Sequence, residues 1–144
     1  MFNIIMANTI HADKIAELEK VCFSEPWSSN TITDAMEHGT SFFIAINDGE
    51  LLGYIGISTV LDEGYITNVA VFPEHRKKGV ASALLNEIFT LAKEKQLSFV
   101  SLEVRESNTA AISLYEKFDF QNAGLRRDFY RNPKENACIM TKRF

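Results

Sequence analysis

The chain has 144 residues, 46% of them hydrophobic and 24% charged, which excludes a disordered chain and suits one domain over residues 1–144. The net charge of −4 argues against a nucleic-acid-binding protein. No apolar run approaches a membrane span and no signal-peptide pattern opens the chain, so we expect a cytoplasmic protein without nucleic acid or membrane as a partner.

The N-terminal part predicts one strand and two helices. The strand covers residues 2–6, and a second helix covers 28–37, with serine caps at its start and Gly39 at its end. The first helix covers 12–23, because apolar residues recur there at roughly helical spacing, at Ile15, Leu18, Val21 and Cys22.

Three runs rich in strand-forming residues follow. They cover 41–47, 51–60 and 65–72, and turn signals separate them at Asp48-Gly49 and at 62–64. Consecutive strands joined by tight turns predict an antiparallel meander.

The second half alternates helices and strands. Helices are expected over 80–95 and 110–117, with a strand over 97–104 between them. A last strand pair is expected over 118–123 and 138–143, joined by a loop. This order favours an α/β fold with a mixed sheet and helices on its faces.

The clearest chemical signal is a basic, glycine-containing loop between a strand and a helix, at 76–81 (RKKGVA). A helix N-terminus has unpaired backbone N–H groups and partial positive charge, so it binds anions. Gly79 allows close approach of the backbone, Ala81 keeps the first turn small, and the three cations add charge. The spacing matches neither a Walker A loop nor GxGxxG, and a basic loop that merely precedes a helix is the alternative.

Two cysteines, Cys22 and Cys138, stand far apart, without CxxC or Cys/His spacing. We therefore expect reduced thiols and no metal.

Several segments together resemble one enzyme family. R-x-x-G-x-A at 76–81, entered from N-V-A-V-x-P at 68–73, resembles the acetyl-CoA-binding motif of the GNAT N-acetyltransferases. L-E-V-R-x-S-N at 102–108, A-A-x-x-L-Y at 110–115 and P-W-S at 26–28 resemble the subgroup that acetylates the N-terminal alanine of ribosomal proteins. The resemblance spans nearly the whole chain and implies the GNAT fold, a mostly antiparallel sheet flanked by helices.

The resemblance implies that backbone groups hold acetyl-CoA. Its pyrophosphate would lie on the loop, and its pantetheine would lie along a strand that a bulge splays from its neighbour. The residues at these positions are Val69, Ala70, Val71, Arg76, Lys77, Lys78, Gly79, Val80, Ala81, Ser82 and Asn108. An ordinary buried strand explains the valines equally well, and a helix N-cap explains Asn108.

The same resemblance assigns Glu103 as general base and Tyr115 as general acid. Strand alternation places Glu103 on the face opposite three apolar residues, where a carboxylate is unusual unless it faces a cleft. The alternatives are a surface pair of Glu103 with Arg105 or another cation, and a core role for Tyr115. By analogy, Trp27 and Tyr130 line the acceptor side, with core packing as the alternative.

One position departs from the family pattern. Asp119 stands where the family usually has glycine after the helix that carries the tyrosine. Aspartate tolerates the left-handed backbone conformation better than most residues, so we expect the helix end to survive.

The acceptor is expected to be a protein N-terminal α-amine, and the resemblance implies the N-terminal alanine of a small-subunit ribosomal protein. An α-amine has a pKa of about 7.7–8.0 and lysine about 10.4, so one carboxylate deprotonates the α-amine more easily. The alternatives are a GNAT enzyme for lysine or a small amine, a non-catalytic CoA-binding module, and a nucleic-acid-binding domain.

Overall fold

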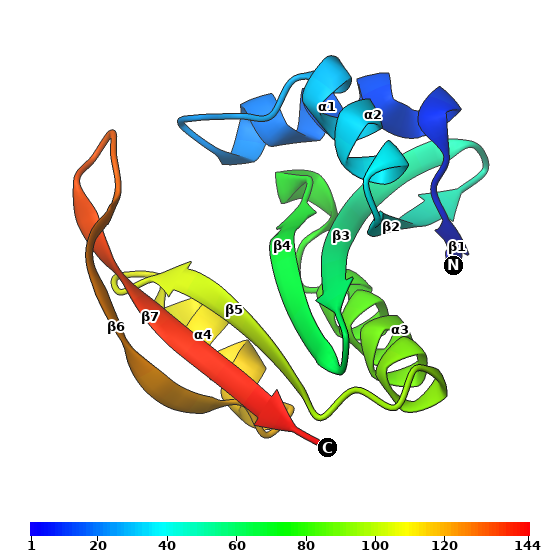
Figure 1. Ribbon diagram of the computed structural model, residues 1–144. Coiled ribbons are helices and arrows are strands. Elements are labelled where there is room, and N and C mark those ends of the chain that lie inside the picture. Colours follow the sequence, from blue (N-terminus) through cyan, green and yellow to red (C-terminus); the bar gives the residue numbers. More distant parts are fainter.

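The computed structural model describes residues 1–144 (Figure 1). Two short 3₁₀ turns lie at Thr9–His11 and Pro73–His75. The predicted strands and helices are all present, in the order β1 (Asn3–Met6), α1 (Ala12–Cys22), α2 (Ser29–Glu37), β2 (Thr40–Asn47), β3 (Glu50–Val60), β4 (Glu63–Val71), α3 (Val80–Glu94), β5 (Phe99–Arg105), α4 (Thr109–Lys117), β6 (Gln121–Tyr130) and β7 (Glu135–Arg143).

All seven strands form one sheet in the order β1-β2-β3-β4-β5-β7-β6. Only β4 and β5 are parallel, and α3 forms the crossover between them. The remaining neighbours are antiparallel, which confirms the mixed α/β sheet and the meander of β2, β3 and β4. The turn at Asp48-Gly49 has positive φ at both residues, as a tight hairpin turn requires.

The helices cover the two faces of the sheet and bury a separate core on each (Figure 1). α1 and α2 pack on one face, over a core that includes Ile15, Leu18, Ile32, Phe42 and Tyr54. α3 and α4 pack on the other face, over a core that includes Leu84, Ile88, Val100, Leu102 and Tyr115.

β4 and β5 diverge in the middle of the sheet, and this divergence positions the candidate site (Figure 1). They pair only from Glu63↔Phe99 to Tyr65↔Ser101. Just beyond, the pairing of β4 with β3 shifts by one residue, so that Thr67 is the extra residue of a β-bulge. The structure therefore contains both the bulge and the splay that the family resemblance implied.

Gly56 on β3 makes room for this bulge. A Cβ at Gly56 would collide with the Thr67 hydroxyl and would come within 2.9 Å of the Phe42 ring. The bulge is thus coupled to the packing beneath α1 and α2.

Two details of the prediction were wrong. Val21 is 55% exposed, and Glu19 takes the buried position on that face of α1. The last strand pair is longer than predicted, because β6 and β7 extend through residues expected to form a loop and leave a tip of only 131–134. β6 is an edge strand with mostly exposed residues, so it lacks the alternation that marks a half-buried strand.

Candidate active site

The loop before α3 has the form of an anion site. Gly79 caps the helix in the left-handed conformation, with φ of 83°, and no side chain caps the helix. The first backbone hydrogen bond of the helix runs from Ala83 N–H to the Gly79 carbonyl, so the N–H groups of Val80, Ala81 and Ser82 have no partner within the helix. A Cβ at Gly79 would point into open space, which leaves room for phosphate oxygens. The residues of this loop therefore fit a pyrophosphate group.

The basic residues of this loop have different surroundings. Lys77 and Lys78 are exposed, and Lys77 has a positive φ of 63°. Arg76 turns back onto the protein: its Nε donates to the Val71 carbonyl at 3.0 Å, and its Nη2 lies 3.4 Å from the Cys22 sulfur. Arg76 therefore braces the loop against the end of β4 and the end of α1.

The edge of β4 beside the splay offers further backbone groups. Beyond Tyr65, β4 has no pairing with β5, so the groups that face this edge at Val69, Ala70 and Val71 have no strand partner there. Ala70 and Val71 are buried and Val69 is half-buried. The free backbone groups of this edge thus lead along the chain into the α3 loop.

Glu103 lies across the splay, near the end of β5. The neighbouring Val104 and Leu102 are buried, whereas Glu103 is half-buried on the opposite face. It has no ion-pair partner, because Arg105 pairs with Glu135 at 3.2 Å instead. The alternative of a surface pair between Glu103 and Arg105 is thereby removed.

Tyr115 lies in the last turns of α4 and is only 7% exposed. Its ring packs against Phe120 at 5.6 Å between centroids. Burial, with a smaller contribution from Tyr130, raises the pKa of Tyr115 to about 12. The ring therefore belongs to the core, and its hydroxyl stays protonated at neutral pH.

Tyr130, at the end of β6, interacts electrostatically with both Glu103 and Tyr115. Burial raises the pKa of Tyr130 to about 12, and the Glu103 charge adds to that rise. The Arg105 guanidinium lies 4.4 Å from the centre of the Tyr130 ring. Tyr130 therefore lies directly against Arg105, within the electrostatic reach of Glu103.

Arg105 clamps the tip of the β6–β7 hairpin. Its Nη1 donates to the Pro133 carbonyl at 2.9 Å and its Nη2 to the Arg131 carbonyl at 3.1 Å. Glu135, the ion-pair partner of Arg105, also accepts from the Ser107 N–H at 2.6 Å. The hydrogen bonds from Ser107 and then Arg105 hold the pKa of the Glu135 carboxyl below its usual range.

Both ends of α4 are well formed. Asn108 is the N-cap, and its side-chain oxygen accepts from the Ala111 N–H at 3.2 Å, so the capping role is present. Asp119 has φ of 69°, the left-handed conformation expected at the usual glycine position. The Phe120 N–H donates to the Tyr115 carbonyl at 3.1 Å, which closes the helix.

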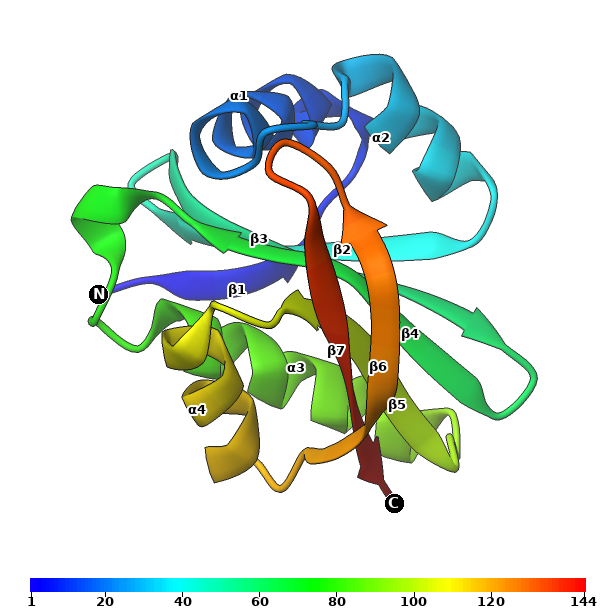
Figure 2. The same cartoon turned by 90° about the vertical axis from the view of Figure 1, so that its left-hand side faces the viewer.

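The α1–α2 loop and the β6–β7 hairpin meet above the splay (Figure 2). Asn132 at the hairpin tip donates to Glu25 in the loop at 3.5 Å. Trp27 in the same loop packs edge-on against Phe42 at 6.5 Å, so the core-packing alternative describes part of its role. These segments form a wall on one side of the splay.

A buried polar network, which was not predicted, lies beneath this wall. Glu19, fully buried on α1, accepts from the Trp27 N–H, the Tyr54 hydroxyl and the Asn68 side chain. The sequence contains one sign of this network: the carboxylate of Glu19 stands within the apolar face of α1, at the helical spacing of Ile15 and Leu18.

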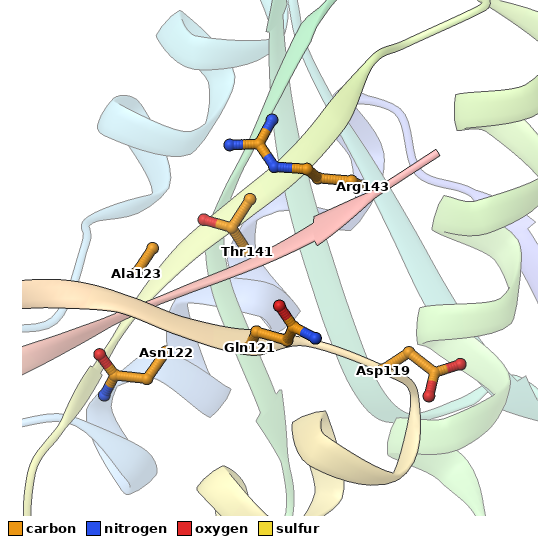
Figure 3. A pocket seen from close by; sticks show the side chains of 6 residues that line it. All are labelled: Asp119, Gln121, Asn122, Ala123, Thr141 and Arg143. Carbon is orange, nitrogen blue, oxygen red and sulfur yellow. The ribbon is translucent and has the colours of Figure 1, made fainter.

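A polar hollow elsewhere contains none of the predicted site residues (Figure 3). It lies between the start of β6 and the end of β7, at the end of the sheet away from Arg105, and is lined by Asp119, Gln121, Asn122, Ala123, Thr141 and Arg143.

No helix is long and apolar enough to cross a membrane, and no three His, Cys, Asp or Glu side chains gather as a metal site.

Comparisons with known proteins agree with this geometry. The sequence model of the acetyltransferase (GNAT) family matches residues 12–120. The chain is 32% identical to the ribosomal protein bS18-alanine N-acetyltransferase of Escherichia coli, over 85% of this chain and 84% of that protein. It is 38% identical to a Bacillus subtilis protein provisionally assigned the same activity, over 89% of this chain and 86% of that one. The crystal structure of the ribosomal-protein-S18-alanine N-acetyltransferase from Escherichia coli superposes with a TM-score of 0.92 at 30% identity, covering 99% of this chain and 94% of that one.

Proposed function

The chain belongs to the GNAT family of N-acetyltransferases, and from that premise we propose that it transfers acetyl from acetyl-CoA to a protein N-terminal α-amine. The relatives from Escherichia coli and Haemophilus influenzae are named for the alanine of ribosomal protein bS18, and we propose the same acceptor class here. The observation that carries the proposal is the unpaired carboxylate of Glu103 across the splay from a loop of free backbone N–H groups.

Acetyl-CoA supplies an activated acyl group as a thioester. We assign its pyrophosphate to the N–H groups of the α3 loop, with Lys77 and Lys78 adding positive charge and Arg76 bracing the loop. We assign its pantetheine to the open edge of β4 at 69–71 and to Asn108, whose amide nitrogen is not used by the helix cap. A β4 N–H at this edge would stabilise charge that develops on the carbonyl oxygen.

Glu103 acts as the general base in this proposal. It accepts one proton from the acceptor ammonium, directly or through one water, before the neutral amine attacks the thioester carbonyl. The C–N bond then forms and the C–S bond breaks, and the second proton lost by the nitrogen balances the proton taken up by the departing thiolate. Its position on the acceptor face, free of any cation, keeps the carboxylate available for that proton.

Tyr115 acts on the leaving thiolate. A pKa of about 12 keeps its hydroxyl protonated, so a hydrogen-bond donor is always present. A free thiol has a pKa of about 8.5, which is lower than that of Tyr115, so transfer of the tyrosine proton to the thiolate is uphill. The hydroxyl therefore first stabilises the thiolate as a hydrogen-bond donor. Once it has given up its proton, it quickly recovers one. Tyr130, beside Glu103, completes the wall against which the acceptor lies.

Three matched peptides test the proposed function: one with a free N-terminal alanine, one with that amine blocked, and one with lysine as its only amine. Thiol release from acetyl-CoA and the mass of each peptide are measured. The proposal requires turnover of the first peptide only. Turnover confined to lysine, or to none of the three, would contradict it and would direct the search to lysine or small-molecule amines.

A further inference from the structure

Glu19 is a carboxylate in the interior of the protein, with no exposed surface. Its desolvation raises the pKa of the carboxyl, so the group must be compensated by donors. No lysine or arginine supplies that compensation. Three neutral donors do so, and each comes from a different part of the fold.

The first donor belongs to the α1–α2 loop. The Trp27 N–H donates to Glu19 Oε1 at 2.9 Å. The Glu19 carbonyl accepts the Phe23 N–H at 2.9 Å, at the other end of the same loop. The Glu19 side chain therefore holds the Trp27 end of the loop that walls the acceptor side, whereas the bond to Phe23 is the ordinary backbone bond at a helix end.

The other two donors belong to the sheet. The Tyr54 hydroxyl of β3 donates to Glu19 Oε2, and Asn68 Nδ2 of β4 donates to the same oxygen at 3.3 Å. Asn68 directly follows Thr67, the extra residue of the bulge, and precedes the open edge at 69–71. The carboxylate therefore connects the acceptor wall to the bulge that opens the site.

We propose that Glu19 is a positioning residue, which fixes the α1–α2 loop on the β4 bulge and thereby sets the binding of the acceptor. This inference rests on the proposed function for its acceptor part. Glu19 touches no reacting atom, because its carboxylate is fully buried and its oxygens are taken by Trp27, Tyr54 and Asn68.

A purely structural role makes a different prediction. A carboxylate that serves only overall stability would, when replaced, lower the melting temperature without changing the loop or the acceptor constants of the folded protein. A positioning role changes the loop and the acceptor KM more than the affinity for acetyl-CoA, because the α3 loop makes no contact with Glu19 and only the Asn68 bond reaches β4.

Trp27 gives a readout that needs no catalysis, because it is the only tryptophan of the chain. Acrylamide quenching of its fluorescence is measured for the wild type, Glu19→Ala, Glu19→Gln and Tyr54→Phe, together with KM for the acceptor and Kd for acetyl-CoA. Ile88→Val is the control, since Ile88 is fully buried in the core on the other face.

In Glu19→Ala we expect stronger quenching of Trp27 and a rise of about 10-fold or more in acceptor KM, from the loss of a charged hydrogen-bond acceptor. The Kd for acetyl-CoA rises by less than the acceptor KM, since the α3 loop keeps its contacts and only the Asn68 bond to β4 is lost. Glu19→Gln, which still accepts from Trp27, and Tyr54→Phe, which leaves two donors, show smaller changes in the same direction. These two variants decide the question if Glu19→Ala does not fold.

Wild-type quenching and acceptor KM in the Glu19 variants, or changes equal to those of Ile88→Val, would overturn the inference. If the wild type acetylates none of the peptides, the proposed function fails, whereas the quenching comparison still decides whether Glu19 holds the loop.

Discussion

The two sides of the proposed site are built from different chemical groups. The donor side, from the open edge of β4 to the first turn of α3, offers mainly backbone N–H groups in a fixed conformation. The acceptor side is made of side chains that meet from α1, β5 and the β6–β7 hairpin, among them Glu103, Arg105 and Glu19.

Because of this difference, we expect the two sides to be sensitive to different kinds of amino-acid substitution. On the donor side, a change of backbone conformation should matter more than loss of one side chain. On the acceptor side, single side chains hold whole segments in place, so their removal should alter acceptor binding or chemistry and leave acetyl-CoA binding intact. The predictions below separate the two sides.

Replacing the proposed base should have the largest effect. We expect Glu103→Gln to lower kcat by about 10²–10⁴-fold, because an amide cannot accept the ammonium proton. The Kd for acetyl-CoA, measured by calorimetry, should not change. Glu106→Gln is the matched control, an exposed carboxylate three residues further along. Near-normal turnover of Glu103→Gln would remove Glu103 as the base.

Releasing the hairpin should have the next largest effect. Arg105→Met keeps the apolar stem but removes the hydrogen bonds to the Arg131 and Pro133 carbonyls and the pair with Glu135. We expect kcat/KM for the peptide to fall by about 10–100-fold, from the loss of charged hydrogen bonds. Arg126→Met serves as control, because Arg126 is exposed on the same hairpin and makes no such bonds. Equal effects of the two substitutions would refute the clamp.

A backbone change on the donor side should weaken acetyl-CoA binding. Gly79→Ala places a side chain at φ of 83°, and strain of about 1–2 kcal/mol predicts a Kd raised about 5–30-fold if the loop shifts to relieve it. Gly39→Ala imposes similar strain at φ of 96° after α2, and its Cβ also meets open space. It should lower stability and leave the Kd unchanged. A Gly79→Ala variant with normal Kd would displace the pyrophosphate from this loop.

Tyr115 should make the free energy of unfolding depend on pH in the alkaline range. The folded-state pKa of Tyr115, about 12, lies above the unfolded value of about 10, so its contribution is fully present below pH 10 and is lost as the pH rises toward 12. Tyr115 alone should lose roughly 2–3 kcal/mol of unfolding free energy over that range, and Tyr130, whose pKa is also raised, adds to the loss. Urea unfolding at several pH values measures this slope. Tyr115→Phe should reduce it, and an unchanged slope would show that Tyr115 is not the group responsible.

The smallest effect concerns the end of α4. Asp119→Gly should raise the unfolding free energy by about 0.5–1 kcal/mol, because glycine adopts φ of 69° without strain. Thermal unfolding measures the change, and kcat should stay as in the wild type. A lower melting temperature would mean that the contact of Asp119 with Lys142, at 3.9 Å, outweighs the strain.

The donor side could be predicted from the sequence because its signal is local. The loop at 76–81, the glycine and the following helix are contiguous, and the helix N-terminus creates the anion site by itself. Strand alternation likewise placed Glu103 on the correct face of β5. The prediction that α4 ends normally at Asp119 rested on the tolerance of aspartate for the left-handed conformation, which Asp119 adopts.

The acceptor side could not be predicted in the same way, because its contacts join distant segments. Arg105 meets carbonyls 26 and 28 residues away, and Glu19 meets Tyr54 and Asn68 at separations of 35 and 49. A carboxylate on the apolar face of α1 indicated a buried partner but not its identity. The strand pair was predicted, but the part of the hairpin nearest its tip was expected to be a loop, because the polar edge strand β6 has no periodic pattern.

The division into two sides is tested most directly by initial rates measured over a matrix of acetyl-CoA and peptide concentrations for the wild type, Gly79→Ala and Arg105→Met. We predict that Gly79→Ala raises only the constants for acetyl-CoA, and that Arg105→Met changes only the constants for the peptide. If either substitution changes both sets of constants equally, the two sides are not separate and the account is wrong.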